Sequence, residues 1–127
     1  MQAYLIIFLG GGLGAAARHF VGTVTARSFG HGFPVGTLTV NVVGSLLMGL
    51  LIGWLAQRAL GDQSLRLFLA TGFLGGFTTF SAFSLDTITL WERGATSLTA
   101  IYVLGSVTLS VLAVFFGLAI ARALFAG

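Results

Sequence analysis

The sequence predicts an all-α membrane protein in which four helices cross the bilayer and the third helix is broken near its middle. Two compositional features support this fold class, because 57% of the residues are hydrophobic and only 7% are charged. A soluble domain carries roughly 25% charged residues, so this chain has too few to cover a water-soluble globule. The third observation is a series of long apolar segments separated by short polar loops, each segment long enough for the roughly 20 helical residues of one crossing.

The reactive and charged side chains exclude several classes of function. The six basic residues are all arginines and are dispersed, whereas nucleic-acid binding requires a clustered basic patch. The chain has no cysteine, which excludes thiol chemistry and cysteine metal sites. Phosphate-loop, zinc-hydrolase and metal-spaced motifs are also missing, so the sequence predicts no enzyme. The 127 residues are expected to form a single transmembrane domain.

The first span is expected over about residues 3–25. It is interpreted as a retained helix, because the first four residues lack the basic region of a signal peptide. Gly10 and Gly14 lie four residues apart, a spacing that lets another helix approach closely in lipid. Arg18, late in this span, has two interpretations. It extends towards the membrane interface, or it lines an aqueous vestibule that attracts anions.

The second span is expected over about residues 36–57, after a short loop that contains the only proline, Pro34. Residues that are polar or small recur there every four positions and share nearly one face of a helix: Asn41, Ser45, Gly49 and Gly53. The last three predict a helix-packing seam. Asn41 either forms a hydrogen bond to another helix or lines a pore, because an amide inside a membrane needs polar partners.

The third span is expected over about residues 65–91, after a loop at 61–64. Its residues 72–84 include three glycines, four hydroxyl side chains and four phenylalanines. The glycines at 72, 75 and 76 weaken a helix and predict a local break. Carbonyl groups freed by a break suit a small cation, and the next helix start offers N–H groups to an anion. The alternative is a glycine-rich dimer seam.

Phe80 and Phe83 are three residues apart in this span and therefore share a helix face. Two phenylalanines in a membrane helix ordinarily serve only for packing. A phenyl ring has a positive edge, however, so rings presented edge-on can help to coordinate an anion without supplying a full charge. Such weak binding suits conduction, because a conducted ion must be able to leave its site.

The fourth span is expected over about residues 96–124 and carries a polar track. Tyr102, Ser106 and Ser110 follow one another at intervals of four residues, so they lie on one face of the helix. Either the serine hydroxyls bond back to carbonyls of their own helix, or the track faces a polar path through the bilayer.

The arginines predict no single orientation in the membrane. Four spans place both termini on one side of the membrane, and the arginines divide almost evenly between the two sides. Arg58, Arg66 and Arg122 belong to the side of the termini. Arg27 and Arg93 belong to the opposite side, and Arg18 lies nearer to that opposite side. Orientation is normally set by a clear bias of basic residues between the two sides. The near-balance predicts dual topology, with opposite copies pairing as an antiparallel homodimer.

Two segments resemble a known family. Residues 75–84 read G-G-F-T-T-F-S-A-F-S and resemble the G-G-x-[ST]-T-F-S-T-F-S signature of the small dual-topology fluoride channels, the Fluc (CrcB-type) family. Residues 36–41 read G-T-L-T-V-N and resemble its G-T-L-x-V-N motif, and the glycine run ending at Arg18 is also similar. The resemblance covers essentially the whole chain. It implies a passive channel in the bacterial inner membrane that exports fluoride and relieves its toxicity.

The resemblance also implies roles for individual residues. It implies an antiparallel homodimer with two fluoride pores, lined by Asn41, Phe80, Ser81, Phe83, Tyr102, Ser106 and Ser110. The ring edges of Phe80 and Phe83 would contact fluoride. The backbone carbonyls of Gly75 and Thr78 would hold a structural Na⁺ on the dimer axis, and Arg18 would lie in a vestibule.

The chain departs from the family pattern at three positions. Ala82 stands where the signature has threonine, which removes a hydroxyl beside the phenylalanine pair. Val114 is apolar where relatives can extend the polar track, and Asp86 is one methylene shorter than the common glutamate. These changes bear on the conduction rate and the detailed ion path.

Two other functions fit a chain of this kind. A small proton-coupled exporter of cationic compounds also uses four short helices, but it needs a carboxylate deep in a span, and Asp86 is the only candidate and lies off centre. A non-transporting assembly subunit would explain the glycine seams and leave the polar tracks unexplained.

Overall fold

The part of the chain that the structure describes contains four helical segments long and apolar enough to cross a membrane. The computed structural model describes residues 1–58 and 63–125. The four segments are Gln2–Phe29, Val35–Ala56, Gln63–Glu92 and Thr96–Phe125. The all-helical class and the interruption of the third segment are therefore confirmed. Of the loop expected at 61–64, residues 61 and 62 lie outside the described residues, while Gln63 and Ser64 already belong to a helix.

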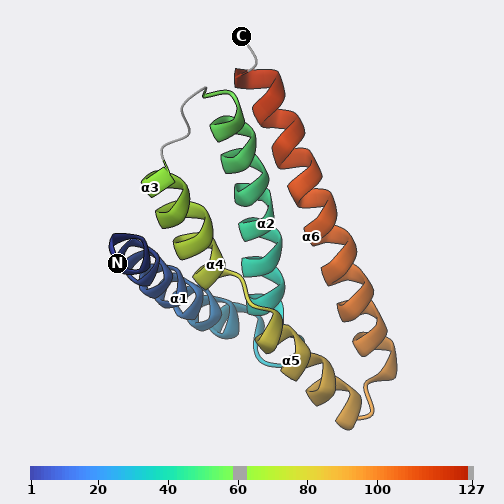
Figure 1. Cartoon of the computed structure of the whole chain (residues 1–127). Helices are drawn as coiled ribbons and strands as arrows, with labels where there is room; N and C mark the ends of the chain where they lie inside the picture. Colours follow the sequence, from blue (N-terminus) through green and yellow to red (C-terminus); the bar gives the residue numbers. More distant parts are fainter. Residues whose placement is uncertain (59–62, 126–127) are drawn as a thin grey trace.

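The third segment consists of four consecutive pieces (Figure 1). It begins with α3 (Gln63–Arg66), continues as a π-helix, η1 (Leu67–Leu74), and ends its first half with the single turn α4 (Gly75–Phe77). The second half is α5 (Phe80–Glu92). The other three segments are continuous helices: α1 (Gln2–Phe29), α2 (Val35–Ala56) and α6 (Thr96–Phe125).

The helices pack mainly as two groups (Figure 1). α2 runs beside α6 along most of its length, and α1 packs across η1 and α4. α5 leaves the direction of η1 and continues towards the lower end of α6 in this view. The chain direction therefore changes at the junction between α4 and α5.

Glycines bring α2 and α6 into backbone contact. A methyl group at Gly49 would lie 3.0 Å from the Cα of Gly117, and one at Gly53 would lie 2.5 Å from the Cβ of Ala121. Side chains at these positions would push the helices apart, which would remove close packing that lipid cannot replace. The packing seam expected for Gly49 and Gly53 is confirmed, whereas Ser45 faces a cavity.

A second glycine seam joins α1 to the first half of the third segment. A methyl group at Gly10 would lie 3.2 Å from the Cα of Gly72, one at Gly14 would collide with the carbonyl of Phe73, and one at Gly76 would collide with the carbonyl of Gly11. These glycines lie in helical turns and do not themselves form the break. The expected break is present and follows directly after Gly75–Phe77, while the glycines at 72 and 76 also make room for α1.

The break falls at Thr78 and Thr79. Both residues have extended backbone, with φ −87° and ψ 156° at Thr78 and φ −152° and ψ 121° at Thr79. The N–H and the hydroxyl of Thr78 both donate to the Leu74 carbonyl, each at 3.0 Å, which satisfies the end of the first half. The hydroxyl of Thr79 accepts the N–H of Ala82 at 3.1 Å and caps α5.

Candidate functional site: two cavities that meet at the helix break

Asn41 on α2 holds the broken backbone in place. Its Oδ1 accepts the N–H of Thr79 at 2.7 Å, and its Nδ2 donates to the Thr79 carbonyl at 3.0 Å. One amide side chain thus pairs with both backbone groups of the extended residue, as a neighbouring strand would. Inside a bilayer such groups need protein partners, because lipid offers none. Of the two interpretations of Asn41, the interhelical bond is confirmed, and the same residue also lines a cavity.

The break frees two carbonyl groups. In a continuous α-helix the Thr79 N–H would pair with the Gly75 carbonyl, and the Ala82 N–H would pair with the Thr78 carbonyl. Here those two donors bond instead to Asn41 Oδ1 and to Thr79 Oγ1. The carbonyls of Gly75 and Thr78, the two expected to bind a cation, have therefore lost their usual helical partners. Gly75 is also exposed on the surface of the protomer.

A groove of about 370 Å³ lies between the break, α2, α5 and α6. Five of the residues expected to line a pore line this groove: Asn41, Phe80, Phe83, Ser106 and Ser110. Val114 also lines it and ends the row of serines with an apolar side chain. The structure therefore brings residues from three separate spans to one concave surface, and we call this surface the groove.

The aromatic side of the groove is only partly covered by the protomer. Phe80 is 77% exposed, and its ring centroid lies 5.5 Å from that of Phe83 at an angle of 47°. The Phe83 ring in turn lies 5.2 Å from the ring of Tyr102. Phe80 therefore presents its ring outward, whereas Phe83 is held from behind.

Tyr102 and Ser106 lie deeper than the sequence alone indicates. Tyr102 is 1% exposed, and its hydroxyl donates to Asp86 Oδ2 at 3.0 Å, so it supports Phe83 from behind the groove. The hydroxyl of Ser106 is buried and, within the described residues, has no hydrogen-bond partner. Back-bonding to its own helix therefore does not occupy the hydroxyl of Ser106, a residue that also lines the groove. An unpaired buried hydroxyl is costly unless an ion or water completes it.

Ser81 is the one expected pore residue in the third span that is not among the residues lining the groove. It is exposed, and its hydroxyl lies 3.3 Å from that of Thr79. The first turn of α5 directs Phe80 and Phe83 to the groove, and Ser81, one residue after Phe80, points to a different side.

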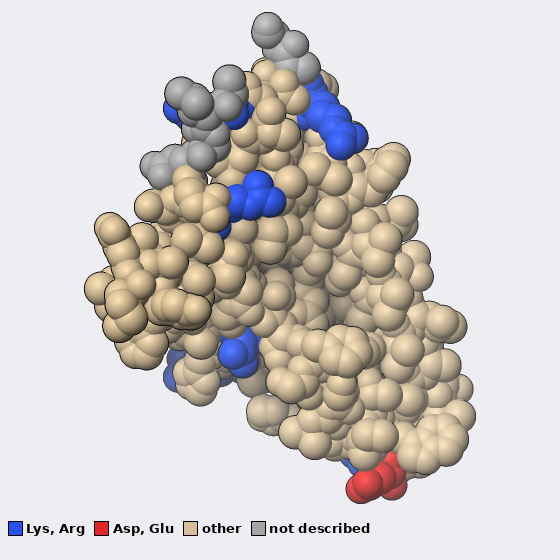
Figure 2. Space-filling model, viewed as in Figure 1, with Lys and Arg blue, Asp and Glu red and all other residues tan. Residues whose placement is uncertain are grey.

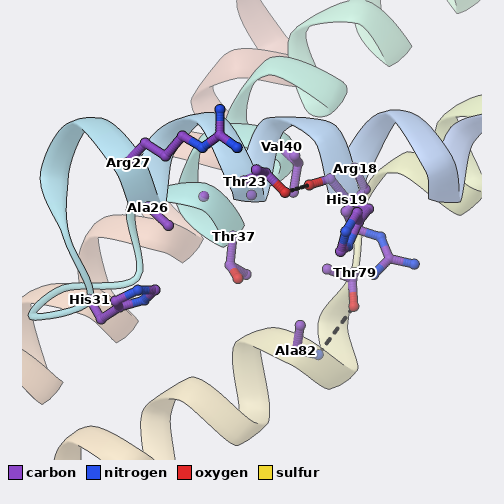
Figure 3. Close-up of a pocket in the computed structure, with 12 residues that line it drawn as sticks. Arg18, His19, Thr23, Ala26, Arg27, His31, Thr37, Val40, Thr79 and Ala82 are labelled. Carbon is purple, nitrogen blue, oxygen red and sulfur yellow. Dashed lines mark hydrogen bonds between the residues drawn. The ribbon is translucent and has the colours of Figure 1, made fainter.

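A second and larger cavity, of about 700 Å³, opens on the other side of the break, and we call it the vestibule (Figure 3). Arg18 lines it, as expected, and its Nε donates to the Gly76 carbonyl at 3.0 Å. Thr79 lines both the vestibule and the groove. The two cavities therefore meet at the residue whose backbone is held by Asn41. Arg18 therefore both lines the vestibule and ties α1 to α4.

Ala82 lies in the vestibule rather than among the groove residues (Figure 3). The hydroxyl that the family signature places here would therefore face the vestibule. Ala82 thus lies next to Phe83 on α5 but lines the other cavity, since Phe83 lines the groove.

Sequence reasoning missed three vestibule residues, His19, Arg27 and His31. A signal for two of them exists, because His19, Thr23 and Arg27 follow one another at intervals of four residues and share a helix face. His31 belongs to the loop between α1 and α2, and no periodic pattern places a loop residue. On the face shown in Figure 2, the basic side chains lie in separate spots, in agreement with their dispersed positions in the sequence.

Comparison with known proteins places the chain in a family. Residues 5–118 match the family described as "CrcB-like protein, Camphor Resistance (CrcB)". A protein of Rhodopseudomonas palustris (strain BisB5), named "Fluoride-specific ion channel FluC", is 57% identical over 123 residues, which cover 97% of this chain and 99% of that protein. Proteins of the same name from Paracoccus denitrificans (strain Pd 1222) and Hyphomonas neptunium (strain ATCC 15444) are 57% and 54% identical over 125 and 127 residues. These two alignments cover 98% and 99% of this chain and 98% and 100% of those proteins.

The family match covers all four membrane-capable helices in whole or in large part. It agrees with the resemblance drawn from residues 75–84 and 36–41. The chain is a multi-pass membrane protein that belongs to the CrcB-like family.

Proposed function

We propose that the chain forms a passive, fluoride-selective channel in the bacterial inner membrane. The observation that carries this proposal is the groove, in which Phe80 and Phe83 face the serines of α6 beside the amide of Asn41. Relatives more than 50% identical over nearly their whole length are named fluoride-specific ion channels, which supports fluoride as the ion. Fluoride enters cells as neutral HF and dissociates, and a negative membrane potential then drives the anion out through a channel at about 2.3 kcal/mol per 100 mV.

The groove offers an anion only neutral contacts. Its described lining contains hydroxyl, amide and phenyl groups and no arginine, lysine or histidine. Asn41 Nδ2 has two hydrogens, and only one is needed for the bond to Thr79, so the second remains available. The Ser106 hydroxyl, which is buried without a hydrogen-bond partner, would be the second donor to the ion. Neutral donors and ring edges bind a small anion weakly enough for it to leave, and no covalent step is needed.

The proposed channel is an antiparallel homodimer with two pores. In the protomer Phe80 is mostly exposed, so one wall of the groove is missing, and a second copy would supply that wall. The near-balance of arginines on the two sides supports insertion in both orientations. Cells expressing a C-terminal tag should show the tag on both sides of the inner membrane. A tag found on one side only would rule out the antiparallel arrangement.

A structural Na⁺ on the dimer axis fits the freed carbonyls of Gly75 and Thr78. Carbonyl oxygens are hard ligands suited to a small hard cation, and both carbonyls have lost their usual helical partners at the break. Two antiparallel copies would contribute four such oxygens, and the ion would neutralise their partial charges and link the protomers. Replacing Na⁺ with a large organic cation should lower the thermal stability of the purified dimer. Unchanged stability would remove the cation from the proposal.

Reconstituted liposomes test the function directly. Loaded with fluoride and monitored with a fluoride electrode, they should release F⁻ rapidly when a potassium ionophore removes the opposing potential, and a chloride electrode should detect no matching release. Proton-coupled uptake of a cationic dye without fluoride efflux would instead support the exporter. Fluoride efflux no faster than that of protein-free liposomes, together with no dye uptake, would leave only the assembly subunit.

A further inference from the structure

Four aromatic rings form a continuous chain of contacts from a loop to the groove. Phe33 lies in the loop between α1 and α2, and its ring centroid lies 5.5 Å from that of Tyr102 at an angle of 88°. The Tyr102 ring lies 5.2 Å from that of Phe83. The Phe83 ring lies 5.5 Å from that of Phe80, and of the four residues only these two phenylalanines line the groove. The contacts therefore link the proposed pore to a loop residue outside its lining.

Tyr102 is the central ring of this chain, and its surroundings leave it little room. The side chain is 1% exposed and belongs to the continuous helix α6. Its hydroxyl donates to Asp86 Oδ2 at 3.0 Å, which fixes one end of the side chain. Aromatic pairs prefer particular relative orientations, so the rings of Phe33 and Phe83 restrict how the Tyr102 ring turns about that fixed end.

The loop that carries Phe33 is itself held in place. Arg93, which directly follows α5, donates from Nη2 to the Gly32 carbonyl at 2.9 Å. On the other side, the Val35 N–H donates to the Phe33 carbonyl at 2.8 Å. The backbone is therefore fixed on both sides of the Phe33 side chain, whose half-buried ring is directed at Tyr102.

We propose that Phe33 is a positioning residue for the proposed pore, and that it holds the Phe83 ring at the groove by way of Tyr102. This inference rests on the proposed channel function and adds to it a residue from a loop. Phe83 depends on such support because its other ring neighbour, Phe80, is 77% exposed. A ring edge that contacts one ion after another must keep its orientation. Without the Phe33 ring, Tyr102 would turn into the vacated space and Phe83 would follow it.

NMR spectra of the tyrosines test the first step, because the chain has only two tyrosines, Tyr4 and Tyr102. With isotope-labelled tyrosine rings in the purified protein, Phe33→Leu should shift the signals of Tyr102, since an aromatic neighbour is lost. The signals of Tyr4, which is 75% exposed on α1, should stay in place. Phe29→Leu is the matched control, because this ring is 67% exposed and has no ring partner within residues 1–58 and 63–125. It should move neither set of signals.

Fluoride efflux from liposomes tests the second step. Phe33→Leu should slow efflux about threefold, because the lost aromatic contact acts on the pore through Tyr102. Phe33→Tyr keeps the ring and should retain most of the flux. Phe29→Leu should leave the flux unchanged.

A double variant separates positioning from a general structural role. Phe83→Ile alone should slow efflux about tenfold, because a ring of the groove is lost. Adding Phe33→Leu should slow efflux no further, because the residue through which Phe33 acts is already replaced. A loop residue that served only the stability of the fold would instead slow efflux by the same factor in both backgrounds.

A second variant keeps the test available if Phe33→Leu yields little folded protein. Arg93→Gln releases the Gly32 carbonyl and disturbs the same loop from outside, so it should also shift the Tyr102 signals. Tyr102 signals that stay in place in the variant examined overturn the inference, and so does a further loss of about threefold when Phe33→Leu is added to Phe83→Ile. Absence of fluoride efflux from the wild type would contradict the channel function alone, and the tyrosine signals would still decide whether Phe33 positions Tyr102.

Discussion

The two halves of the third span meet very different surroundings within the same chain. Before the break, η1 and α4 press against α1 so closely that Gly14 and Gly76 leave no room for a methyl group. After the break, α5 contacts α6 but leaves Phe80 largely exposed. The first half therefore packs closely within its own protomer, while the second half still presents the ring of Phe80 outward. The contacts that hold the helix on one side of the break therefore lie in η1 and α4, whereas the contacts of the proposed pore lie in α5.

The glycine seam should be the more sensitive half to mutation. Gly14→Ala places a methyl group against the Phe73 carbonyl, and overpacking of this kind should cost about 3 kcal/mol or more, seen as a lower unfolding temperature and loss of monodisperse protein. Gly12→Ala is the matched control, because a methyl group there meets nothing within 4 Å. It should stabilise the helix by up to about 1 kcal/mol. Equal effects of the two substitutions would contradict the seam.

Loss of the two hydrogen bonds between Asn41 and Thr79, which we call the clamp, should lower both the stability of the protein and the fluoride flux. Asn41→Leu has a similar volume but leaves the Thr79 N–H and carbonyl without partners, at about 1–3 kcal/mol for each group that stays buried. Fluoride efflux from liposomes should fall about tenfold or more, since 1.4 kcal/mol at one site is tenfold. Ser45→Ala, one turn along the same face, removes a polar group without touching Thr79 and should keep the stability. An Asn41→Leu protein as stable as the wild type would show that the break does not depend on the clamp.

A substitution in the exposed second half of the third span should change the fluoride flux and leave the stability unchanged. Phe80→Ile should reduce fluoride efflux about tenfold, because ring contacts worth up to about 1.5 kcal/mol are lost. The unfolding free energy should stay within about 0.5 kcal/mol of the wild type, because this ring is mostly exposed in the protomer. Phe8→Ile, at a ring that is 75% exposed on α1, controls for a general loss of aromatic surface and should keep the flux. Unchanged flux in Phe80→Ile would remove this ring from the pore.

Ala82→Thr should have the smallest effect. It restores the hydroxyl of the family signature, but the side chain lines the vestibule and not the groove, so efflux should change by less than about twofold. The same liposome assay measures it, with the unfolding temperature as the control for folding. A tenfold change would show that this hydroxyl acts on the phenylalanine pair and would place it in the groove.

Periodicity and composition were enough to predict the helical class, and the glycines of the third span predicted its break. The extended residues are Thr78 and Thr79, which follow Gly75 and Gly76 within one turn, but the second use of the glycines, as a seam for α1, was not predicted. A glycine that opens a helix and a glycine that admits a neighbouring helix look the same in a sequence. The difference depends on where α1 lies, and a single chain read in order does not contain that information.

Contacts between distant residues account for the other differences. Arg18 reaches the Gly76 carbonyl across 58 positions, and Asn41 reaches Thr79 across 38. Tyr102 follows the spacing of the polar track but turns its hydroxyl to Asp86 behind the groove. Spacing along a helix predicts which side chains share a face, but the partner of that face depends on how the other helices cross it.

The pairing of Asn41 with Thr79 also constrains how the protein can be synthesised and inserted. Until α2 is beside it, the third span has no partner for an extended Thr79, and an unpaired backbone group in lipid costs several kcal/mol. A newly translocated third span is therefore most stable as an unbroken helix, and the isolated second span carries an unpaired amide. Both difficulties disappear when the two segments associate, so the interruption arises during assembly of the bundle and is not a property of the inserted segment on its own.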